Sequence, residues 1–545
     1  MYNHRRINMK GDSVVKEIQI KNFRSLKDTG MQTLSPITLL VGENSSGKST
    51  FLRAFPLLKQ SISKRTSGPI LWAGDVDDYV DFGSFEETVT NDKSNEISFA
   101  FKFKLNASGS TQRYRFNDEH RETIDNSATQ DVRYEITITS ANGKERVSKM
   151  SLEINATHVD FDLDTRTVTT DSGFSYKEVD IESQMSKNTK TSVAAMRRYI
   201  IGSHCFDFRL PAIDEFVELV YQSLAIEEND EVDYYDVKRI VIEIGTSLIN
   251  TGEAPFINEK TIKKTQHLSI YAKTHNKVVS TVVEDGDGKL KEMAKLLAIY
   301  DIFREIEEYL YSYFKQIHYI APLRATAERY YRLRNLAVDE VDYQGKNLPV
   351  FINSLTPAQL KEFHAWTDEH FGFVVNTDKS KGHVSLQIKL HGSDKSINLS
   401  DTGFGYSQVL PIITQLWELS SRRRNNRPTM YIDRNQRIPL VIAIEQPELH
   451  LHPAVQAKLA KAFIACIDLA RKNKCDIQLL IETHSETIVN YFGRAIAREL
   501  LRPDDISVII FEKDADQSIT TVRNSSYNAD GFLTNWPYGF FDSEE

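Results

Sequence analysis

The sequence predicts an α/β fold, in which a mixed β-sheet with flanking helices is interrupted by an inserted, mainly helical region. Two observations carry this prediction. Near each end of the chain, short apolar runs such as Ile37–Val41 and Leu440–Ile444 have the composition and length of buried strands. Between them, residues from about 180 to 316 carry apolar side chains at helical spacing, separated by polar linkers. We therefore expect both ends of the chain to contribute to one sheet-containing unit.

The chain divides into three stretches, which we expect to be an N-terminal lobe (1–175), a helical insertion suited to docking a partner (176–316) and a C-terminal lobe (317–545). Alternating runs in the first lobe predict an antiparallel, half-exposed sheet, with strands at Ile97–Phe103, Arg133–Thr139, Met150–Ile154 and His158–Leu163. The insertion predicts helices at Ala212–Leu224, Asp236–Ile249 and Leu290–Phe314. The last lobe returns to strands, at Ile317–Ile320, Val384–Leu390, Leu440–Ile444, Ile477–Ile481 and Ile506–Phe511.

Composition limits the class of protein. The 545 residues are 40% hydrophobic and carry a net charge of −9, which is ordinary for a folded protein and argues against coating nucleic acid. No apolar run approaches the roughly 18 residues that span a bilayer, so we expect no membrane association. The three cysteines, Cys205, Cys466 and Cys475, lack metal-ligand spacing and predict reduced thiols in a cytoplasmic protein.

Residues 42–49, Gly-Glu-Asn-Ser-Ser-Gly-Lys-Ser, match the phosphate-binding pattern G-x-x-x-x-G-K-[ST]. A short apolar strand precedes the loop and a helix follows it, so convergent backbone N–H groups and the helix dipole point at one anion. In this pattern Lys48 reaches the β- and γ-phosphates, and the Ser49 hydroxyl binds Mg²⁺. The sequence therefore predicts a site for ATP and Mg²⁺.

Two strand ends complete the predicted site. The strand Leu440–Ile444 is followed by Glu445, and a carboxylate at the end of a buried strand suits the Mg²⁺ that Ser49 also binds. The strand ending near Ile481 is followed by Glu-Thr-His-Ser, which places His484 where it can sense a γ-phosphate.

A fourth element is the Ser- and Gly-rich segment 398–408, Asn-Leu-Ser-Asp-Thr-Gly-Phe-Gly-Tyr-Ser-Gln, which opens into an apolar helix at Val409–Trp417. This is a second helix N-terminus suited to an anion. Nothing in the spacing makes it serve the phosphate bound by Lys48 of the same chain. It either caps the nucleotide of a second copy or is an ordinary turn before a helix.

These motifs, in this order, resemble the ABC-type ATPase heads of the SMC/RecF/RecN group, as does the opening segment 14–25 with its Asn-Phe-Arg-Ser turn. More narrowly, the segments Ile-Glu-Gln-Pro-Glu-Leu-His-Leu-His-Pro, Ser-Asp-Thr-Gly-Phe-Gly-Tyr-Ser-Gln-Val-Leu-Pro and Asn-Trp-Pro-Tyr-Gly-Phe-Phe-Asp resemble bacterial OLD-like ATPases. Many of these belong to anti-phage systems, including the Septu ATPase and its retron-associated relatives. Residues 90–315 contain no motif that we can assign.

The resemblance implies a role for each matched residue. The phosphate contacts would be Gly42, Asn44, Gly47, Lys48, Ser49 and Thr50. Glu445 would hold Mg²⁺ and His484 would be the switch histidine. The loop acting on a partner's nucleotide would contain Ser400, Gly403, Gly405 and Ser407, with either serine as the phosphate contact. ATP would then be held between the heads of a homodimer, or of a larger assembly.

The chain departs from the broad pattern beside Glu445. ABC heads usually place a glutamate next, which polarises the attacking water, whereas this chain has Gln446. A glutamine orients water but accepts no proton, so we expect slow turnover unless Glu448 has taken the role of base.

Effector chemistry is expected on another chain. Glu482 with Asp514 and Asp516 imitates the carboxylates of a Toprim nuclease, but their separation is too short. The resemblance implies a separate nuclease, of HNH type, and in retron systems a reverse transcriptase with its non-coding RNA.

Arg324, in Ala-Pro-Leu-Arg, is an anion contact or a structural ion pair. The basic segments 329–334 and 422–427 suit nucleic acid, or are simply solvated.

Two functions follow from these observations. The first is an ATP-gated subunit of a defence complex that senses an invader and licenses a nuclease. The second is a RecF- or RecN-like ATPase of DNA repair or chromosome maintenance, which the acidic balance and the absence of a long coiled coil make the weaker reading.

Overall fold

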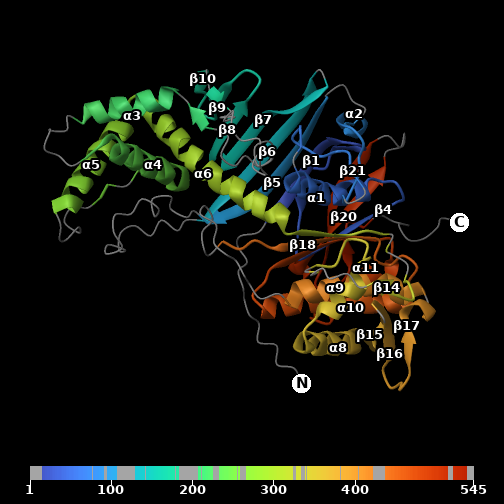
Figure 1. Cartoon of the computed structure of the whole chain (residues 1–545). Coiled ribbons are helices and arrows are strands. Elements are labelled where there is room, and N and C mark those ends of the chain that lie inside the picture. The colour runs from blue at the N-terminus through green and yellow to red at the C-terminus, as the bar shows by residue number, and fades with distance from the viewer. Residues whose placement is uncertain are drawn as a thin grey trace.

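The computed structural model describes residues 15–536 (Figure 1). The described range excludes residues 65, 76–77, 91–94, 107–128, 142, 178–179, 183–206, 210, 225–231, 255, 258–265, 323, 325–326, 333–337, 339, 381, 403, 422–435 and 514–518. The basic segment 422–427, Gly403, Cys205 and the acids Asp514 and Asp516 therefore lie outside the described residues.

A seven-stranded sheet forms the centre of the molecule. Its strand order is β13 (Ile317–Ile320), β18 (Leu440–Glu445), β19 (Ile477–Glu482), β4 (Ile37–Gly42), β20 (Ile506–Lys513), β21 (Thr520–Tyr527) and β22 (Leu533–Thr534). The first five strands are parallel and the last two antiparallel. Every residue of β4, β18 and β19 is buried, which is why these strands are almost continuously apolar in sequence. The predicted strands of both chain ends meet in this one sheet.

Each face of this sheet is covered by a different layer. Along β4, Leu40 packs toward the side that carries α1 (Lys48–Ser63), whereas Leu39 and Val41 pack toward the other side. That other side holds α8 (Pro357–Phe371), α9 (Phe404–Ser421), α10 (Pro453–Lys472) and α11 (Glu486–Ala497). Beyond them lies a small antiparallel sheet with the strands β14 (Tyr331–Arg332), β15 (Phe373–Ser380), β16 (His383–Leu390) and β17 (Ser396–Asn398). Helix α7 (Leu348–Ser354) packs against this sheet.

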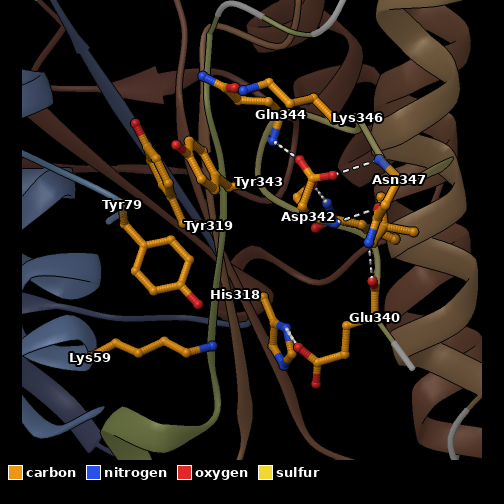
Figure 2. A pocket seen from close by; sticks show the side chains of 12 residues that line it. Lys59, Tyr79, His318, Tyr319, Glu340, Asp342, Tyr343, Gln344, Lys346 and Asn347 are labelled. Atoms are coloured by element: carbon orange, nitrogen blue, oxygen red, sulfur yellow. Dashed lines mark hydrogen bonds and ion pairs between the residues drawn. The ribbon is translucent and has the colours of Figure 1, made fainter. Parts of the chain in front are cut away.

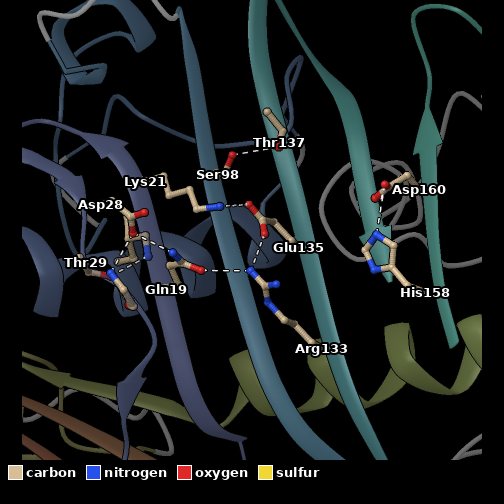
Figure 3. Close-up of polar contacts among 12 residues, drawn as sticks. Gln19, Lys21, Asp28, Thr29, Ser98, Arg133, Glu135, Thr137, His158 and Asp160 are labelled. Carbon is tan, nitrogen blue, oxygen red and sulfur yellow. Dashed lines mark hydrogen bonds and ion pairs between the residues drawn. The ribbon is translucent and has the colours of Figure 1, made fainter. Parts of the chain in front are cut away.

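A second large sheet is wholly antiparallel, as the sequence predicts. Its strands are β1 (Val15–Phe23), β2 (Leu26–Asp28), β3 (Gln32–Thr33), β5 (Glu96–Asn106), β6 (Thr129–Ala141), β7 (Lys144–Ile154), β8 (Thr157–Asp162), β9 (Thr167–Thr170) and β10 (Ser175–Lys177). Alternate residues point to opposite faces. One face is apolar, and Figure 3 shows polar contacts of the other. Lys21 Nζ of β1 lies 2.7 Å from Glu135 Oε1 of β6, and Arg133 Nη2, two residues from Glu135 on the same strand, lies 2.9 Å from Glu135 Oε2.

The helical region follows this sheet, with a two-stranded hairpin at its start. Its elements are β11 (Asp180–Glu182), β12 (Asp207–Arg209), α3 (Pro211–Ser223), α4 (Tyr234–Thr251), α5 (Gln266–Val283) and α6 (Lys289–Lys315). The sequence analysis did not single out α5. The long helix α6 runs from the other helices along the antiparallel sheet (Figure 1), where Tyr309 stacks on Phe103 with ring centroids 4.7 Å apart. Aromatic residues on α6 therefore belong to the core of the sheet.

The α/β fold class, with a mixed sheet, flanking helices and a helical region between its two parts, is confirmed. Among the described helices, none combines the length and apolar character needed to cross a membrane.

Candidate functional site

The phosphate loop lies at the centre of the seven-stranded sheet, between β4 and α1. Both of its glycines are required by geometry. At Gly42 a β-carbon would lie 2.3 Å from the Phe511 carbonyl oxygen, and Gly47, which precedes α1, has φ of 96°, in the left-handed region. The sequence prediction of a strand, a glycine-bounded loop and a helix in succession is confirmed.

Lys48 is buried within this loop. Its ammonium group donates hydrogen bonds to the carbonyl oxygens of Gly42, at 3.1 Å, and of Glu43. Burial lowers the pKa of Lys48, while three nearby carboxylates, including Glu482 and Glu448, act in the opposite direction. A phosphate group would offer this ammonium stronger, charged acceptors than the loop carbonyls do.

Two acids stand side by side next to the loop, because Glu445 and Glu482 are register partners at the ends of β18 and β19. The Oε1 atom of Glu482 accepts a hydrogen bond from Ser49 Oγ at 2.7 Å. Burial, and then the charge of Glu445, raise the pKa of Glu482 to about 7. Glu482 is therefore the carboxylate in contact with Ser49. In the sequence, Glu482 stood out only as an apparent Toprim carboxylate, an assignment that the spacing argues against.

Glu445 has other partners. Arg53, on the second turn of α1, holds it with two hydrogen bonds, from Nε to Oε1 at 2.6 Å and from Nη2 to Oε2 at 2.8 Å. The Tyr319 hydroxyl donates to the same Oε1 at 2.9 Å. The hydrogen bond to Glu445 raises the pKa of Arg53, so the guanidinium stays charged. The predicted metal carboxylate is thus enclosed by a cation and a phenol, neither of which the sequence analysis identified.

The loop after β18 carries the predicted catalytic pair. Gln446 has a left-handed φ of 41° and its side chain lines the nucleotide pocket. Glu448 accepts a hydrogen bond from the backbone N–H of His484 at 2.7 Å, and burial raises the pKa of this carboxyl. Partial burial of the ring, and then the charge of Lys48, lower the pKa of His484 to about 4, so the imidazole is neutral at pH 7.

Arg324 contacts the end of β18, where Glu445 stands. Its Nη2 atom donates to the Glu445 carbonyl oxygen at 3.2 Å, and burial lowers its pKa to about 10. Within the described part of the chain, its Nε and Nη1 atoms and the Oε2 atoms of Glu448 and Glu482 have no hydrogen-bond partner although they are buried. Buried polar atoms without partners are costly, so these donors and acceptors fit a polar, charged ligand.

The pocket beside the phosphate loop has a volume of about 340 Å³. Residues 44–50 of the phosphate loop and α1 line it together with Gln446, Glu482 and His484. Arg24 and Ser25 also line it, and the guanidinium of Arg24 lies 4.7 Å from the centre of the Phe82 ring. In the sequence these two residues belong only to a turn that resembles the family, and nothing there indicated that they line this pocket.

The described residues of the Ser- and Gly-rich loop do not line this pocket. Its 3-10 turn, η3 (Leu399–Asp401), is capped by Asn398, whose Oδ1 accepts bonds from the Ser400 N–H at 3.0 Å and from Ser400 Oγ at 2.9 Å. Ser407 is only 7% exposed on α9, whereas Ser400 is half-buried. A β-carbon on Gly405 would touch Leu451 and the His450 carbonyl, so this loop packs beside the segment that follows Glu448.

A second cavity, of about 470 Å³, is lined by Tyr319, whose hydroxyl also contacts Glu445 (Figure 2). Lys59 and Tyr79 line this cavity together with His318 and Tyr319 of β13. Loop residues 340–344, Lys346, Asn347 and Gln415 of α9 complete the lining. Tyr319 stacks on Tyr343 and donates to Glu445, so one side chain contacts both this cavity and the acid next to the nucleotide pocket.

The residues present fit a divalent cation that arrives with a nucleotide. Groups of three or more His, Cys, Asp or Glu suited to hold a metal alone are not found among the described residues. Ser49 and the unbonded oxygen of Glu482 nevertheless present two oxygen ligands beside the phosphate loop, which is the type of donor that Mg²⁺ prefers.

A glycine-bounded phosphate loop at the centre of a parallel sheet, with a buried lysine and two acids at adjacent strand ends, defines a phosphate-loop ATPase site. The comparisons with known proteins agree with this class. The AAA ATPase domain family matches residues 14–489, and the chain belongs to this family.

Two solved structures are similar to the chain at low sequence identity. One, described as the SmcHead bound to the C-winged helix domain of ScpA, is 11% identical with a TM-score of 0.33, over 94% of this chain and 98% of that one. The other, the SMC head domain from Thermotoga maritima, is 8% identical with a TM-score of 0.31, over 93% and 98%. Curated proteins gave no match to the chain.

Proposed function

We propose that this ATPase is an ATP-gated subunit of a bacterial anti-phage defence complex, which closes as a dimer on ATP and controls a separate effector nuclease. The observation that carries the gating is Gln446, which lines the nucleotide pocket where a catalytic glutamate is usual. An amide accepts no proton from water, so ATP would persist in the site and hold the closed state.

The residues of the pocket are suited to bind ATP and Mg²⁺ even if hydrolysis of the bound ATP is slow. Lys48 and the N-terminal turn of α1 would hold the phosphates, and a bound Mg²⁺ would neutralise part of their charge. His484, neutral at pH 7, would donate or accept one hydrogen bond at the γ-phosphate. Glu448 is the remaining candidate base, but its Oε1 is already used by the His484 backbone. Its unbonded Oε2 is the atom that would receive a proton.

A second copy would complete the site. The η3 turn with Ser400 has no part in the pocket of its own chain, and the half-buried Ser400 is more exposed than the buried Ser407, which favours Ser400 as the contact to a partner's nucleotide. ATP would therefore stabilise a dimer of heads, with each η3 turn serving the opposite phosphate loop.

The defence role rests on the resemblance of the segments around Glu445, Ser400 and residues 535–542 to OLD-like and Septu-like ATPases. The same resemblance supports a partner nuclease of HNH type and, in retron systems, a reverse transcriptase with its RNA. The helices between residues 211 and 283 are the proposed docking region for such a partner, since the C-terminal part of α6 is taken up by the antiparallel sheet.

The experiment has two arms. Sedimentation velocity of the full chain should show a dimer with ATP and a monomer with ADP, and Lys48→Ala should remain monomeric in both. Cells that carry the complete operon should lose protection in a phage plating assay when Lys48→Ala replaces the wild type. A strictly monomeric ATP-bound protein would refute the gating, and full protection by Lys48→Ala would refute the role of ATP in defence.

A further inference from the structure

The contact between Ser49 and Glu482 joins two segments 433 residues apart in the chain. It arises because β19 is the immediate neighbour of β4, with Glu482 in register with Leu40. Ser49 stands in the first turn of α1, directly after the phosphate loop. The carboxylate in contact with the metal-binding hydroxyl therefore comes from β19 and not from β18.

The other oxygen of Glu482 has no partner. The residue is only 1% exposed, and within the described residues its Oε2 accepts no hydrogen bond. The ammonium of Lys48, whose charge acts on Glu482, donates to the loop carbonyls of Gly42 and Glu43. A buried carboxylate oxygen without a donor or a cation is strongly unfavourable, and Glu482 lines the nucleotide pocket.

Glu445, in contrast to Glu482, has hydrogen-bond partners for both of its carboxylate oxygens. Both of its carboxylate oxygens accept charge-assisted bonds from Arg53, and Oε1 also accepts from the Tyr319 hydroxyl. Arg53 and Tyr319 thus satisfy both oxygens, and Glu445 is not among the residues that line the nucleotide pocket. The two acids are register partners on neighbouring strands. A metal site at Glu482 would therefore lie about one strand spacing, roughly 4.8 Å, from a site at Glu445.

We propose that Glu482, and not Glu445, supplies the carboxylate ligand to the Mg²⁺ of the bound nucleotide, with Ser49 as the second protein ligand. Glu445 is then a positioning residue, which fixes Arg53 and Tyr319 beneath the phosphate loop. This inference rests on the proposed binding of ATP.

The test measures metal binding directly. Mn²⁺ would be titrated into the full chain saturated with a non-hydrolysable ATP analogue, with free Mn²⁺ followed by electron paramagnetic resonance. The isosteric variants Glu482→Gln and Glu445→Gln form a matched pair on adjacent strands. We expect Glu482→Gln to weaken Mn²⁺ binding by at least about tenfold, and Glu445→Gln to change it by less than about threefold.

A second measurement separates metal from nucleotide. The affinity of a fluorescent ATP analogue would be compared in Mg²⁺ and in EDTA, where Glu482→Gln should lose the gain due to Mg²⁺ but bind at least as well as wild type in EDTA. Should Glu482→Gln fail to fold, Glu482→Asp keeps the charge, shortens the reach and should also weaken Mn²⁺ binding.

Wild-type Mn²⁺ affinity in a folded Glu482 variant, or a larger loss in Glu445→Gln, would overturn the assignment. A wild-type chain that binds no nucleotide would instead refute the proposed function on which it rests.

Discussion

The ion pair between Arg53 and Glu445 allows a quantitative test, because its two members differ in exposure. The Glu445 side chain is 2% exposed and the Arg53 side chain 38% exposed. In Arg53→Ala the carboxylate stays buried with only the Tyr319 hydroxyl as donor. In Glu445→Gln the guanidinium can turn toward water. We therefore expect Arg53→Ala to be the more destabilising change, although it removes the more exposed partner.

The size of the effect follows from these contacts. Breaking a fully buried pair by removing one partner costs about 3–5 kcal/mol. Arg53 is partly solvated and Tyr319 remains bonded to Glu445, so we expect about 2 kcal/mol for Arg53→Ala and about 1 kcal/mol for Glu445→Gln. The measurement is urea unfolding of the nucleotide-free chain followed by tryptophan fluorescence.

The chain supplies a matched control. Arg523 and Glu512 form a pair at 2.7 Å in which the arginine is again 38% exposed but the glutamate is 37% exposed. Surface pairs contribute about 0–1 kcal/mol, so Arg523→Ala should cost less than Arg53→Ala by about 1 kcal/mol or more. Equal costs for the two arginine variants, or a larger cost for Glu445→Gln than for Arg53→Ala, would refute the reasoning from burial.

The remaining predictions concern nucleotide and turnover. Lys48→Ala removes the buried cation of the phosphate loop, so the affinity for ATP should fall by about 100-fold in a fluorescent-nucleotide titration, and unchanged affinity would exclude this loop as the site. Gln446→Glu supplies a base and should raise phosphate release by about tenfold or more, whereas Glu448→Gln should lower it. Fast release that neither variant alters would count against both roles. Ser400→Ala should slow phosphate release without loss of ATP binding, while Ser407→Ala should act mainly on thermal stability, and the reverse result would reassign the contact.

The Ser400 prediction depends on burial, which the sequence did not reveal. Both serines stand in one Gly-rich segment, and either is a chemically reasonable phosphate contact. The structure separates them because Asn398 holds Ser400 in the η3 turn, whereas α9 turns Ser407 toward its own core. Which of the two serines is buried depends on where α9 begins relative to the sheet on which it packs. Short-range sequence patterns do not determine this position.

The sequence by itself determined the elements whose physical cause is local. The phosphate loop could be located because eight consecutive residues encode a strand end, two glycines and a helix start. The parallel strands could be located because burial on both faces makes them continuously apolar. The antiparallel sheet followed from alternation between an apolar and a polar face, which Figure 3 shows on its polar side.

Only the tertiary structure decided which side chains meet in the site. Arg53 contacts Glu445 across 392 residues of sequence and Ser49 contacts Glu482 across 433. Two glutamates at the ends of two similar apolar strands are indistinguishable by pattern. The order of β18, β19 and β4 in the sheet brings one of them to Arg53 and the other to Ser49. Partner choice depends on this order because carboxylate bonds act over about 3 Å, whereas neighbouring strands lie about 4.8 Å apart.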